Sequence, residues 1–269
     1  MGPEASDGPA HLGRQGLAQL IASALARPAE RRLREGGPAR LLGAVRGALH
    51  LGLEGFVVSV TARPVPLMAN AVGLAAPSLD LAGLAEGMPV RIAGGAIAVG
   101  TLRIAWADAP VWDPAVPVVD AALDPSALPG PEGLELAATD VGARGIALLR
   151  TALAERDPGA AGEAAEALIG RGPGLTPEGD DLLAGAAIGA RALGRVAVAE
   201  ALCPADAEAR TSAVSATLLR LAAAGAAPEP VVRLLGGADP VGAVAELLGL
   251  GRSTGRAIAA GLGLAMGAP

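Results

Sequence analysis

The feature that most constrains this fold is a proline-rich stretch that separates two halves of different texture. Residues 107–131 carry Pro110, Pro114, Pro117, Pro125, Pro129 and Pro131. Because proline lacks the N–H that helices and sheets need, we expect a domain boundary there. Short β-like runs precede the stretch and helical patterns follow it. The chain is therefore predicted to be α+β: a β-rich, barrel-like or bent-sheet N-terminal half followed by an all-helical C-terminal half. The expected divisions are an N-terminal arm and helix at 1–39, a β-rich domain at 40–125 and a helical domain at 126–269.

Short strand patterns fill the first half. Phe56–Thr61 is the clearest, while Pro89–Ile92 and Ile97–Val99 flank a Gly-Gly pair that indicates a hairpin. Leu102–Trp106 is expected to be a further strand. Upstream, the apolar residues between Leu12 and Leu25 recur at helical spacing and predict a helix that ends before a proline. Closely spaced short strands favour a compact barrel or a strongly bent sheet.

The second half is predicted to consist of helices. Leu134–Leu153, Ala161–Ile169 and Asp180–Val198 each show a helical pattern, and Asp157-Pro158-Gly159 is expected to stop the first of them. The third helix is rich in alanine and glycine, so its neighbours are expected to approach closely.

A Gly/Pro loop that leads into this third helix is the most distinctive motif. It reads Gly170-Arg-Gly-Pro-Gly-Leu-Thr-Pro-Glu-Gly-Asp-Asp181. Thr176 before a proline is a helix-start signal, since its hydroxyl can accept a hydrogen bond from a first-turn N–H. Glycines such as Gly172 and Gly174 can adopt positive φ and let N–H groups converge on a ligand. The loop is therefore predicted to bind an anion at a helix N-terminus.

Glu178, Asp180 and Asp181 place three carboxylates in the same first turn. They can complement the helix dipole, at roughly 0.3–1 kcal/mol each, or they can form a functional site. The residues alone leave both interpretations open. An Mg²⁺ ion between a carboxylate and an anionic ligand would explain why an anion-binding loop is also acidic. Asp180 and Asp181 are therefore the candidate metal ligands and catalytic residues.

Two later segments could contribute to the same site. Thr211 and Ser215 share a helical face, and we prefer hydrogen bonds to carbonyls one turn earlier over the alternative of a polar pocket beside the acidic loop. Arg252, Ser253 and Thr254 lie in a second Gly-rich loop before an apolar helix.

The two loop-and-helix segments echo each other. Gly179-x-x-Leu-Leu-Ala-Gly185 corresponds to Gly255-x-x-Ile-Ala-Ala-Gly261, which suggests a weak internal duplication. Two helix N-termini could then face one ligand from opposite sides. The second loop has arginines where the first has acids, so one loop would hold a cation and the other an anion.

Composition narrows the chemistry further. The chain has no lysine, which excludes a Walker-type, Schiff-base or pyridoxal-phosphate lysine. A single cysteine, Cys203, excludes a disulfide framework and a Cys-based zinc site within one chain. Nothing in the sequence indicates NAD, PLP, haem or zinc. His11 and His50 are the available imidazoles, and His50 is expected to be a packed or surface histidine. Asn70 is explained by turn chemistry as well as by ligand contact.

Charge and hydropathy indicate the setting. The net charge of −6 argues against a broad nucleic-acid-binding face. The N-terminus shows no secretory signal pattern, and no apolar run is long enough to span a bilayer. We therefore expect a cytoplasmic protein with no membrane contact.

The run from Gly172 to Gly185, GPGLTPxGDDxLxG, resembles the signature of the bacterial AllH family, once a domain of unknown function and typified by a subunit of oxamate carbamoyltransferase in anaerobic allantoin (purine) catabolism. The Ser215–Leu219 segment and the Gly-x-Ser-Thr-Gly loop at Gly251 are also similar to family segments, and the resemblance extends from about residue 40 onward. It implies a part in carbamoyl transfer between oxamate and carbamoyl phosphate, together with partner subunits. One departure is Arg256, where an acidic residue is expected, so a related small-molecule reaction is the alternative.

Three classes of function follow: a carbamoyltransferase subunit that binds a small anionic metabolite with Mg²⁺, a stand-alone Mg²⁺-dependent enzyme acting on a phosphorylated or nucleotide-like molecule, and a non-catalytic interaction subunit. A homo-oligomer is a further open possibility. The predicted substrate-binding residues are Gly172, Gly174, Thr176, Ser215, Arg252, Ser253 and Thr254.

Overall fold

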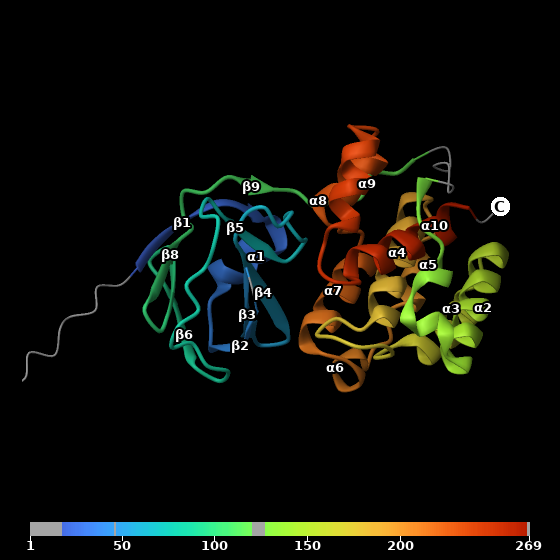
Figure 1. Ribbon diagram of the computed structural model, residues 1–269, viewed down its shortest axis with the longest axis horizontal. Helices are drawn as coiled ribbons and strands as arrows, with labels where there is room; N and C mark the ends of the chain where they lie inside the picture. The colour runs from blue at the N-terminus through green and yellow to red at the C-terminus, as the bar shows by residue number, and fades with distance from the viewer. Residues whose placement is uncertain (1–17, 46, 120–126, 268–269) are drawn as a thin grey trace, which may run out of the picture.

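The computed structural model describes residues 18–45, 47–119 and 127–267. A β-barrel and a helical domain lie side by side, with the barrel formed by the first part of the chain (Figure 1). The predicted α+β class, with a β-rich half followed by a helical half, is confirmed. The expected arm before residue 18, His11 within it, and the division between residues 125 and 126 lie outside the described residues.

The barrel closes because its first strand pairs on both sides. Ala18–Ile21 pair with β8 and Ala22–Leu25 pair with β5, which joins the ends of the sheet order β5-β4-β3-β2-β6-β7-β8-β1. A closed sheet leaves no open edge, and β9 adds to the far end of β1. The strands are β1 (Ala18–Ala26), β2 (Ala39–Val45), β3 (Ala48–Leu53), β4 (Phe56–Thr61), β5 (Ala71–Leu74), β6 (Pro89–Ala93), β7 (Ala96–Val99), β8 (Leu102–Ala105) and β9 (Val111–Trp112).

The helix expected between Leu12 and Leu25 is wrong in the part that the structure describes, because Ala18–Ala26 form β1. Pairing with two neighbouring strands outweighs the local spacing of apolar residues. A helix, α1 (Arg27–Glu35), follows instead, and Pro28 lies in its first turn, where proline needs no partner for an N–H. The strands expected at Phe56–Thr61, at the Gly-Gly hairpin and at Leu102–Trp106 are confirmed as β4, β6, β7 and β8.

β4 is buried on both faces. Val58 and Val60 face the barrel core, while the alternate residues Ser59 and Thr61 lie on the outer face and are buried against the helical domain. The period of two along the strand therefore places hydroxyl groups at the boundary between the two domains.

The helical domain starts with two short 3₁₀ turns. The single helix expected over Leu134–Leu153 is wrong: Thr139 caps a helix that begins at Asp140, and its hydroxyl accepts a hydrogen bond from Gly142 N–H at 3.0 Å. The helix expected over Asp180–Val198 is also interrupted, at Gly194 with φ of 72°. The elements are η2 (Pro131–Gly133), η3 (Glu135–Ala138), α2 (Asp140–Glu155), α3 (Pro158–Leu168), α4 (Glu178–Ala192), α5 (Val196–Ala201), α6 (Ala207–Arg210), α7 (Ala213–Ala223), α8 (Glu229–Leu235), α9 (Pro240–Leu248) and α10 (Thr254–Met266).

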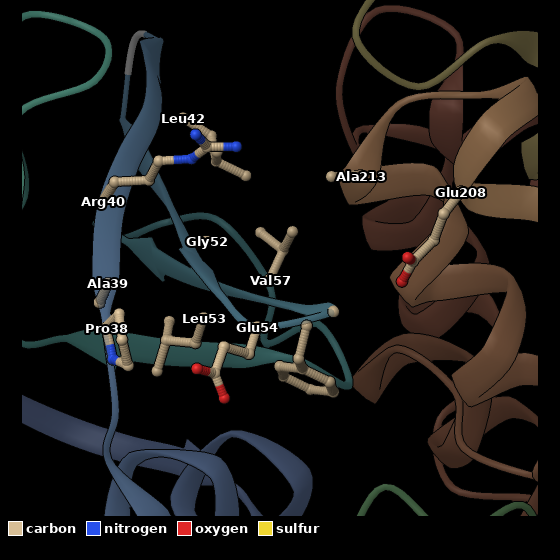
Figure 2. Close-up of a pocket in the computed structure, with 12 residues that line it drawn as sticks. Pro38, Ala39, Arg40, Leu42, Gly52, Leu53, Glu54, Val57, Glu208 and Ala213 are labelled. Atoms are coloured by element: carbon tan, nitrogen blue, oxygen red, sulfur yellow. The ribbon is translucent and has the colours of Figure 1, made fainter.

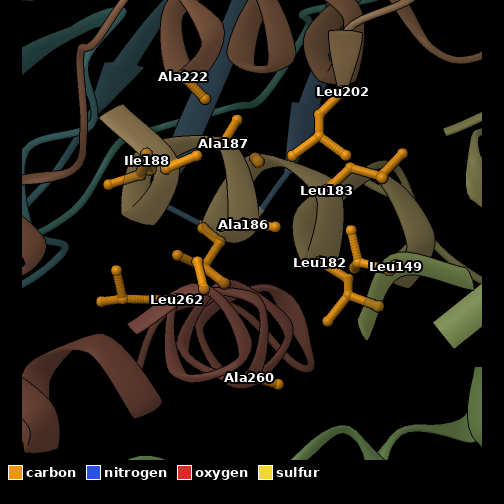
Figure 3. Close-up of a cluster of buried hydrophobic side chains, with 14 of the residues drawn as sticks. Leu149, Leu182, Leu183, Ala186, Ala187, Ile188, Leu202, Ala222, Ala260 and Leu262 are labelled. Atoms are coloured by element: carbon orange, nitrogen blue, oxygen red, sulfur yellow. The ribbon is translucent and has the colours of Figure 1, made fainter. Parts of the chain in front are cut away.

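The centre of this domain is the close contact between α4 and α10 (Figure 3). A Cβ atom added to Gly185 would lie 2.1 Å from the carbonyl oxygen of Ile258, and one added to Gly261 would lie 2.0 Å from that of Leu182. These two contacts join equivalent positions of the echoing segments, in reciprocal fashion. The arrangement supports the internal duplication suggested by the sequence.

Hydrogen bonds join the two domains. Val57 N–H donates to Thr217 Oγ1 at 3.1 Å, and Glu229 N–H donates to the Leu67 carbonyl at 2.9 Å. The outer face of the barrel is thereby held against α7 and the start of α8, next to the two Gly-rich loops.

Candidate functional site

A cavity of about 530 Å³ lies between the outer face of the barrel and the two Gly-rich loops. Its lining is mainly apolar, with a few polar side chains on each wall, as is typical of small-molecule sites. The apolar part includes Val45, Val65, Met68, Leu175, Val214, Leu218 and Leu250. The polar part comprises His50, Ser59, Thr61 and Asn70 on the barrel wall, and Glu135, Thr176, Arg252, Ser253 and Thr254 on the helical wall.

The two Gly-rich loops meet at this cavity, but on the same wall and in contact with each other, not on opposite sides of a ligand as the duplication suggested. The Thr176 and Thr254 hydroxyl oxygens, one from each loop, are 2.8 Å apart. Gly172 lines an adjacent pocket of about 370 Å³ instead, and Ser215 is buried away from the cavity lining. The predicted substrate-binding residues that line the cavity are Gly174, Thr176, Arg252, Ser253 and Thr254.

The first loop contains an anion site that the protein fills itself. Gly170, which has φ of 69°, donates its N–H to Asp180 Oδ1 at 2.7 Å, and the Thr211 hydroxyl donates to Asp180 Oδ2. The acidic residue and the anion-binding loop are thus partners. No bridging ion is needed to explain why they occur together.

The first turn of α4 is closed by backbone contacts. Pro177 is its N-cap, with no side-chain cap, so the predicted capping role of Thr176 is wrong. Gly179 N–H donates to the Arg171 carbonyl at 2.8 Å, and the N–H groups of Asp180 and Asp181 point to the Pro177 carbonyl. These donors are not available to a ligand, because each already has an acceptor within the loop.

The expected bonds from Thr211 and Ser215 to carbonyls one turn earlier are also absent from the described contacts. Thr211 binds Asp180, and the buried Ser215 Oγ has no hydrogen bond of good geometry among the described residues. Thr217 on the same segment does donate to the Ala213 carbonyl, at 2.9 Å. In this segment, Thr211 therefore holds Asp180, whereas Thr217 bonds to the backbone within α7.

Asp181 lies directly behind the Thr176–Thr254 pair. It is 2% exposed, and its Oδ2 has no hydrogen-bond partner among the residues that the structure describes. Burial raises the pKa of Asp181 to about 8, the nearby charges of Asp180 and Glu178 add to this rise, and the two threonine hydroxyls oppose it. The side chain is consequently a neutral acid at pH 7.

The three carboxylates of the motif point in different directions. Glu178 Oε2 accepts the N–H of Leu136 at 2.8 Å and so joins α4 to η3. Burial raises the pKa of Asp180, against the lowering effect of the Gly170 N–H and of the Thr211 and Ser215 hydroxyls.

This divergence does not fit an Mg²⁺ ion held jointly by Asp180 and Asp181. Both Asp180 oxygens already accept hydrogen bonds from the protein. Within residues 18–45, 47–119 and 127–267, no group of three or more His, Cys, Asp or Glu side chains gathers in a way that could hold a metal ion. Magnesium binding at this motif stays a prediction, and it would require the buried Asp181 side chain to lose its proton first.

The barrel wall carries a polar network that the sequence did not reveal. His50 and Ser59 are paired residues of β3 and β4, and His50 Nδ1 lies 3.0 Å from Ser59 Oγ. Asn70 Nδ2 donates to Ser59 Oγ at 3.1 Å and to the Val57 carbonyl at 2.9 Å. Burial lowers the pKa of His50, so this wall is uncharged. The signal in the sequence was the polar pair Ser59 and Thr61 alternating with valines in β4.

Charge is present on the helical wall. Arg252 and Glu135 both line the cavity and form an exposed ion pair, with Nη2 and Oε1 3.3 Å apart. Arg252 immediately precedes α10, whose N-cap residue Ser253 makes no side-chain capping hydrogen bond. A guanidinium and a helix N-terminus without a side-chain cap thus lie at the same edge of the cavity, with the Gly255 N–H already donated to the Leu250 carbonyl at 2.9 Å.

A second cavity, of about 490 Å³, lies between β2–β3 and α6–α7, and its lining includes Arg40, Glu54 and Glu208 (Figure 2). Glu54 pairs with Arg32, and Glu208 pairs with Arg220, which also contacts the carbonyl of Gly55. Its acids are therefore occupied by structural contacts, so the cavity between the loops is the better candidate.

Comparison with known proteins agrees with the motif. Residues 168–266 match the family model described as oxamate carbamoyltransferase subunit AllH, a range that contains both loops, α4 and α10. The resemblance drawn from the GPGLTPxGDDxLxG motif is thereby confirmed for this part of the chain. No curated protein and no solved structure matches the chain. Among the described residues, no helix combines the length and apolar character needed to cross a membrane.

Proposed function

We propose that this chain is a subunit of a carbamoyltransferase-type enzyme, and that its interdomain cavity binds a small anionic metabolite of the oxamate or carbamoyl phosphate class. The observation that carries the proposal is the convergence of both loops of the AllH-matched segment on one cavity, at the edge that bears Arg252. The match itself supports a subunit role, and therefore partner subunits. The ligand is inferred from the chemistry of the lining.

The anionic end of the ligand is assigned to Arg252 and the start of α10. Arginine can hold a carboxylate or phosphate through paired N–H donors, and the helix N-terminus adds a favourable dipole. Glu135 occupies Arg252 in the absence of ligand. Because an exposed ion pair is worth about 0–1 kcal/mol, an incoming anion can displace Glu135 at little cost.

Asp181 is the candidate for proton exchange with the ligand. In carbamoyl transfer from phosphate to an amide nitrogen, a C–N bond forms, the C–O bond to phosphate breaks, the departing phosphate takes up a proton and the nitrogen loses one. As a neutral acid, Asp181 would give its proton to the phosphate and regain one from the nitrogen. Asp181 is connected to the cavity through the Thr176 and Thr254 hydroxyls, which bind it and belong to residues of the cavity lining. Asp180, by contrast, supports the first loop through Gly170, so we assign it to positioning and not to chemistry.

The proposal is tested by ligand-induced stabilisation of the full-length chain. Thermal unfolding is measured with oxamate, carbamoyl phosphate or both, each with and without Mg²⁺. A ligand at 100 times its Kd should stabilise the folded state by roughly 2.7 kcal/mol. Arg252→Ala should weaken binding by roughly tenfold or more, the loss of one charge-assisted hydrogen bond. Arg256→Ala is the matched control, because Arg256 is exposed in the first turn of α10, close to Arg252 in sequence, but does not line the cavity.

The result also separates the alternative functions. Stabilisation only when Mg²⁺ is present would fit both the subunit and a stand-alone Mg²⁺-dependent enzyme, and purification with native neighbours would then separate these two. If neither oxamate nor carbamoyl phosphate, alone or together, stabilises the protein with or without Mg²⁺, the proposal is refuted and a non-catalytic interaction subunit is favoured. That last alternative has its own support in the structure, since Gly179, Gly185 and Gly261 all serve close backbone packing.

A further inference from the structure

We propose that the barrel wall of the cavity is a subsite for an N–H-donating group, such as a primary amide, and that Asn70 and Thr61 form it. The inference rests on the proposed function, because the cavity must first bind a small metabolite. It adds the part of the ligand that the barrel recognises, at the wall opposite Arg252.

The orientation of the Asn70 amide is fixed by its partners. Its Nδ2 lies 2.9 Å from the Val57 carbonyl, which can only accept, so this atom must be the nitrogen. The same nitrogen lies 3.1 Å from Ser59 Oγ. Asn70 Oδ1 is left without a partner among the described residues, although Asn70 is only 1% exposed. Buried side-chain oxygens normally have a hydrogen-bond partner, so this one calls for an explanation.

Thr61 presents a second unpartnered oxygen, that of a hydroxyl, which can accept a hydrogen bond as the Asn70 Oδ1 does and can also donate one. It is 4% exposed, and its Oγ1 also has no partner among the described residues. Thr61 and Asn70 both line the cavity, from β4 and from the residue before β5, which pairs with β4. Both side chains line the same cavity, so a ligand bound there is a source for the hydrogen-bond partners that these two oxygens lack.

The wall selects the type of donor. The cavity-lining side chains of the barrel include no carboxylate, so nothing there would balance an ammonium group. Its histidine is held by Ser59 and has a lowered pKa, so no positive charge there would balance a carboxylate. An uncharged N–H, as in an amide or carbamoyl group, suits acceptors of this kind.

The two walls together describe a ligand with unlike ends. Arg252 favours a negative group on the helical side, while Asn70 and Thr61 favour a neutral N–H on the barrel side. Oxamate and oxalate form a matched pair for this question, because they differ in whether the second end is an amide or a carboxylate. A site that hydrogen-bonds an N–H strongly rejects an analogue that lacks it.

The test is isothermal titration of the full-length chain with oxamate and with oxalate. The wild-type protein should bind oxamate more tightly, by roughly tenfold, the value of one neutral hydrogen bond. Thr61→Val and Asn70→Ala should each reduce this preference and leave the affinity for oxalate unchanged. Ser253→Ala on the helical wall is the control, and it should weaken both ligands alike.

Thr61→Val keeps the shape of the side chain, so the test remains decisive if Asn70→Ala fails to fold. Equal affinity of the wild-type protein for the two ligands, or an unchanged preference in Thr61→Val, would overturn the amide subsite. The proposed function would survive that result as long as binding still depended on Arg252. Absence of binding by either ligand would overturn both.

Discussion

The variant Asp181→Asn measures the free energy that the protein loses by burying the Asp181 carboxylic acid next to its cavity. The pKa of Asp181 rises from 3.8 to about 8 on folding. At pH 7 the unfolded chain therefore carries an ionised side chain and the folded protein a neutral one, so folding takes up a proton. This uptake costs on the order of 4 kcal/mol at pH 7. Asparagine has the same shape and no such cost.

The sign of the pH dependence follows from the raised pKa. The folded protein binds the extra proton between pH 4 and pH 8, so this group makes the wild-type protein less stable as pH rises across that window, by about 1.4 kcal/mol per pH unit. The amide of the variant brings N–H donors that lack partners, at a fixed cost of about 1–3 kcal/mol. The variant should therefore be the less stable protein near pH 4 and the more stable one near pH 8, with a crossing near pH 5–6.

The assay is urea unfolding of the wild-type protein and Asp181→Asn from pH 4 to pH 9, in EDTA and again with Mg²⁺. Asp140→Asn is the control for a first-turn acid that is exposed, and its difference from the wild type should not follow this pattern. The reasoning is refuted if the difference in free energy of unfolding between the wild type and Asp181→Asn stays constant across the whole pH range. Asp181 would then stay ionised in the folded protein. If this difference is constant only when Mg²⁺ is present, the result would instead indicate that Asp181 is ionised and binds the metal ion.

Three further outcomes are expected. Gly185→Ala should lower the free energy of unfolding by about 3 kcal/mol, because the new methyl group meets a carbonyl of α10. Gly162→Ala, which adds its methyl group in open space on α3, should raise the free energy of unfolding by roughly 0.5–1 kcal/mol. Equal effects of the two substitutions in denaturant titration would contradict this. Glu135→Gln should free Arg252 and raise the affinity for an anionic ligand about two- to fivefold in calorimetry, since the exposed pair is worth about 0–1 kcal/mol. Thr61→Val should raise the melting temperature without ligand, because it removes a buried hydroxyl that has no partner; a lower value would show that Thr61 has a partner within the fold.

The sequence was most informative where local chemistry decides the structure. The hairpin at Gly94 and Gly95, both with positive φ, and the alternating strand β4 follow from turn preference and from side-chain period. The echo between the two glycine-rich helices also pointed to the right pair of helices, because residues three to four apart share a face.

The errors arose where distant segments supply the partner. Ala18–Ala26 became a strand because β5 and β8 pair with it from elsewhere in the chain. Thr176 is turned from its own helix toward Thr254, and Asp180 accepts hydrogen bonds from Gly170 and Thr211. None of these contacts has a signature in the neighbouring residues.

The barrel wall of the site could not be predicted for a related reason. His50, Ser59 and Asn70 come together only through the pairing of β3, β4 and β5, and they form a cavity wall only because the helical domain covers that face. A histidine and an asparagine in apolar surroundings are individually unremarkable, so the sequence left their roles open.

The glycine contact between α4 and α10 has the geometry of a two-fold dimer within one chain. Each helix offers the same small residue to the same carbonyl position of its counterpart, as identical subunits do across an isologous interface. Two identical copies would present two identical loops to the space beside them. Within one chain the two copies are free to differ: the first loop ends in acids that the fold buries, whereas the second places Arg252 at the edge of the cavity.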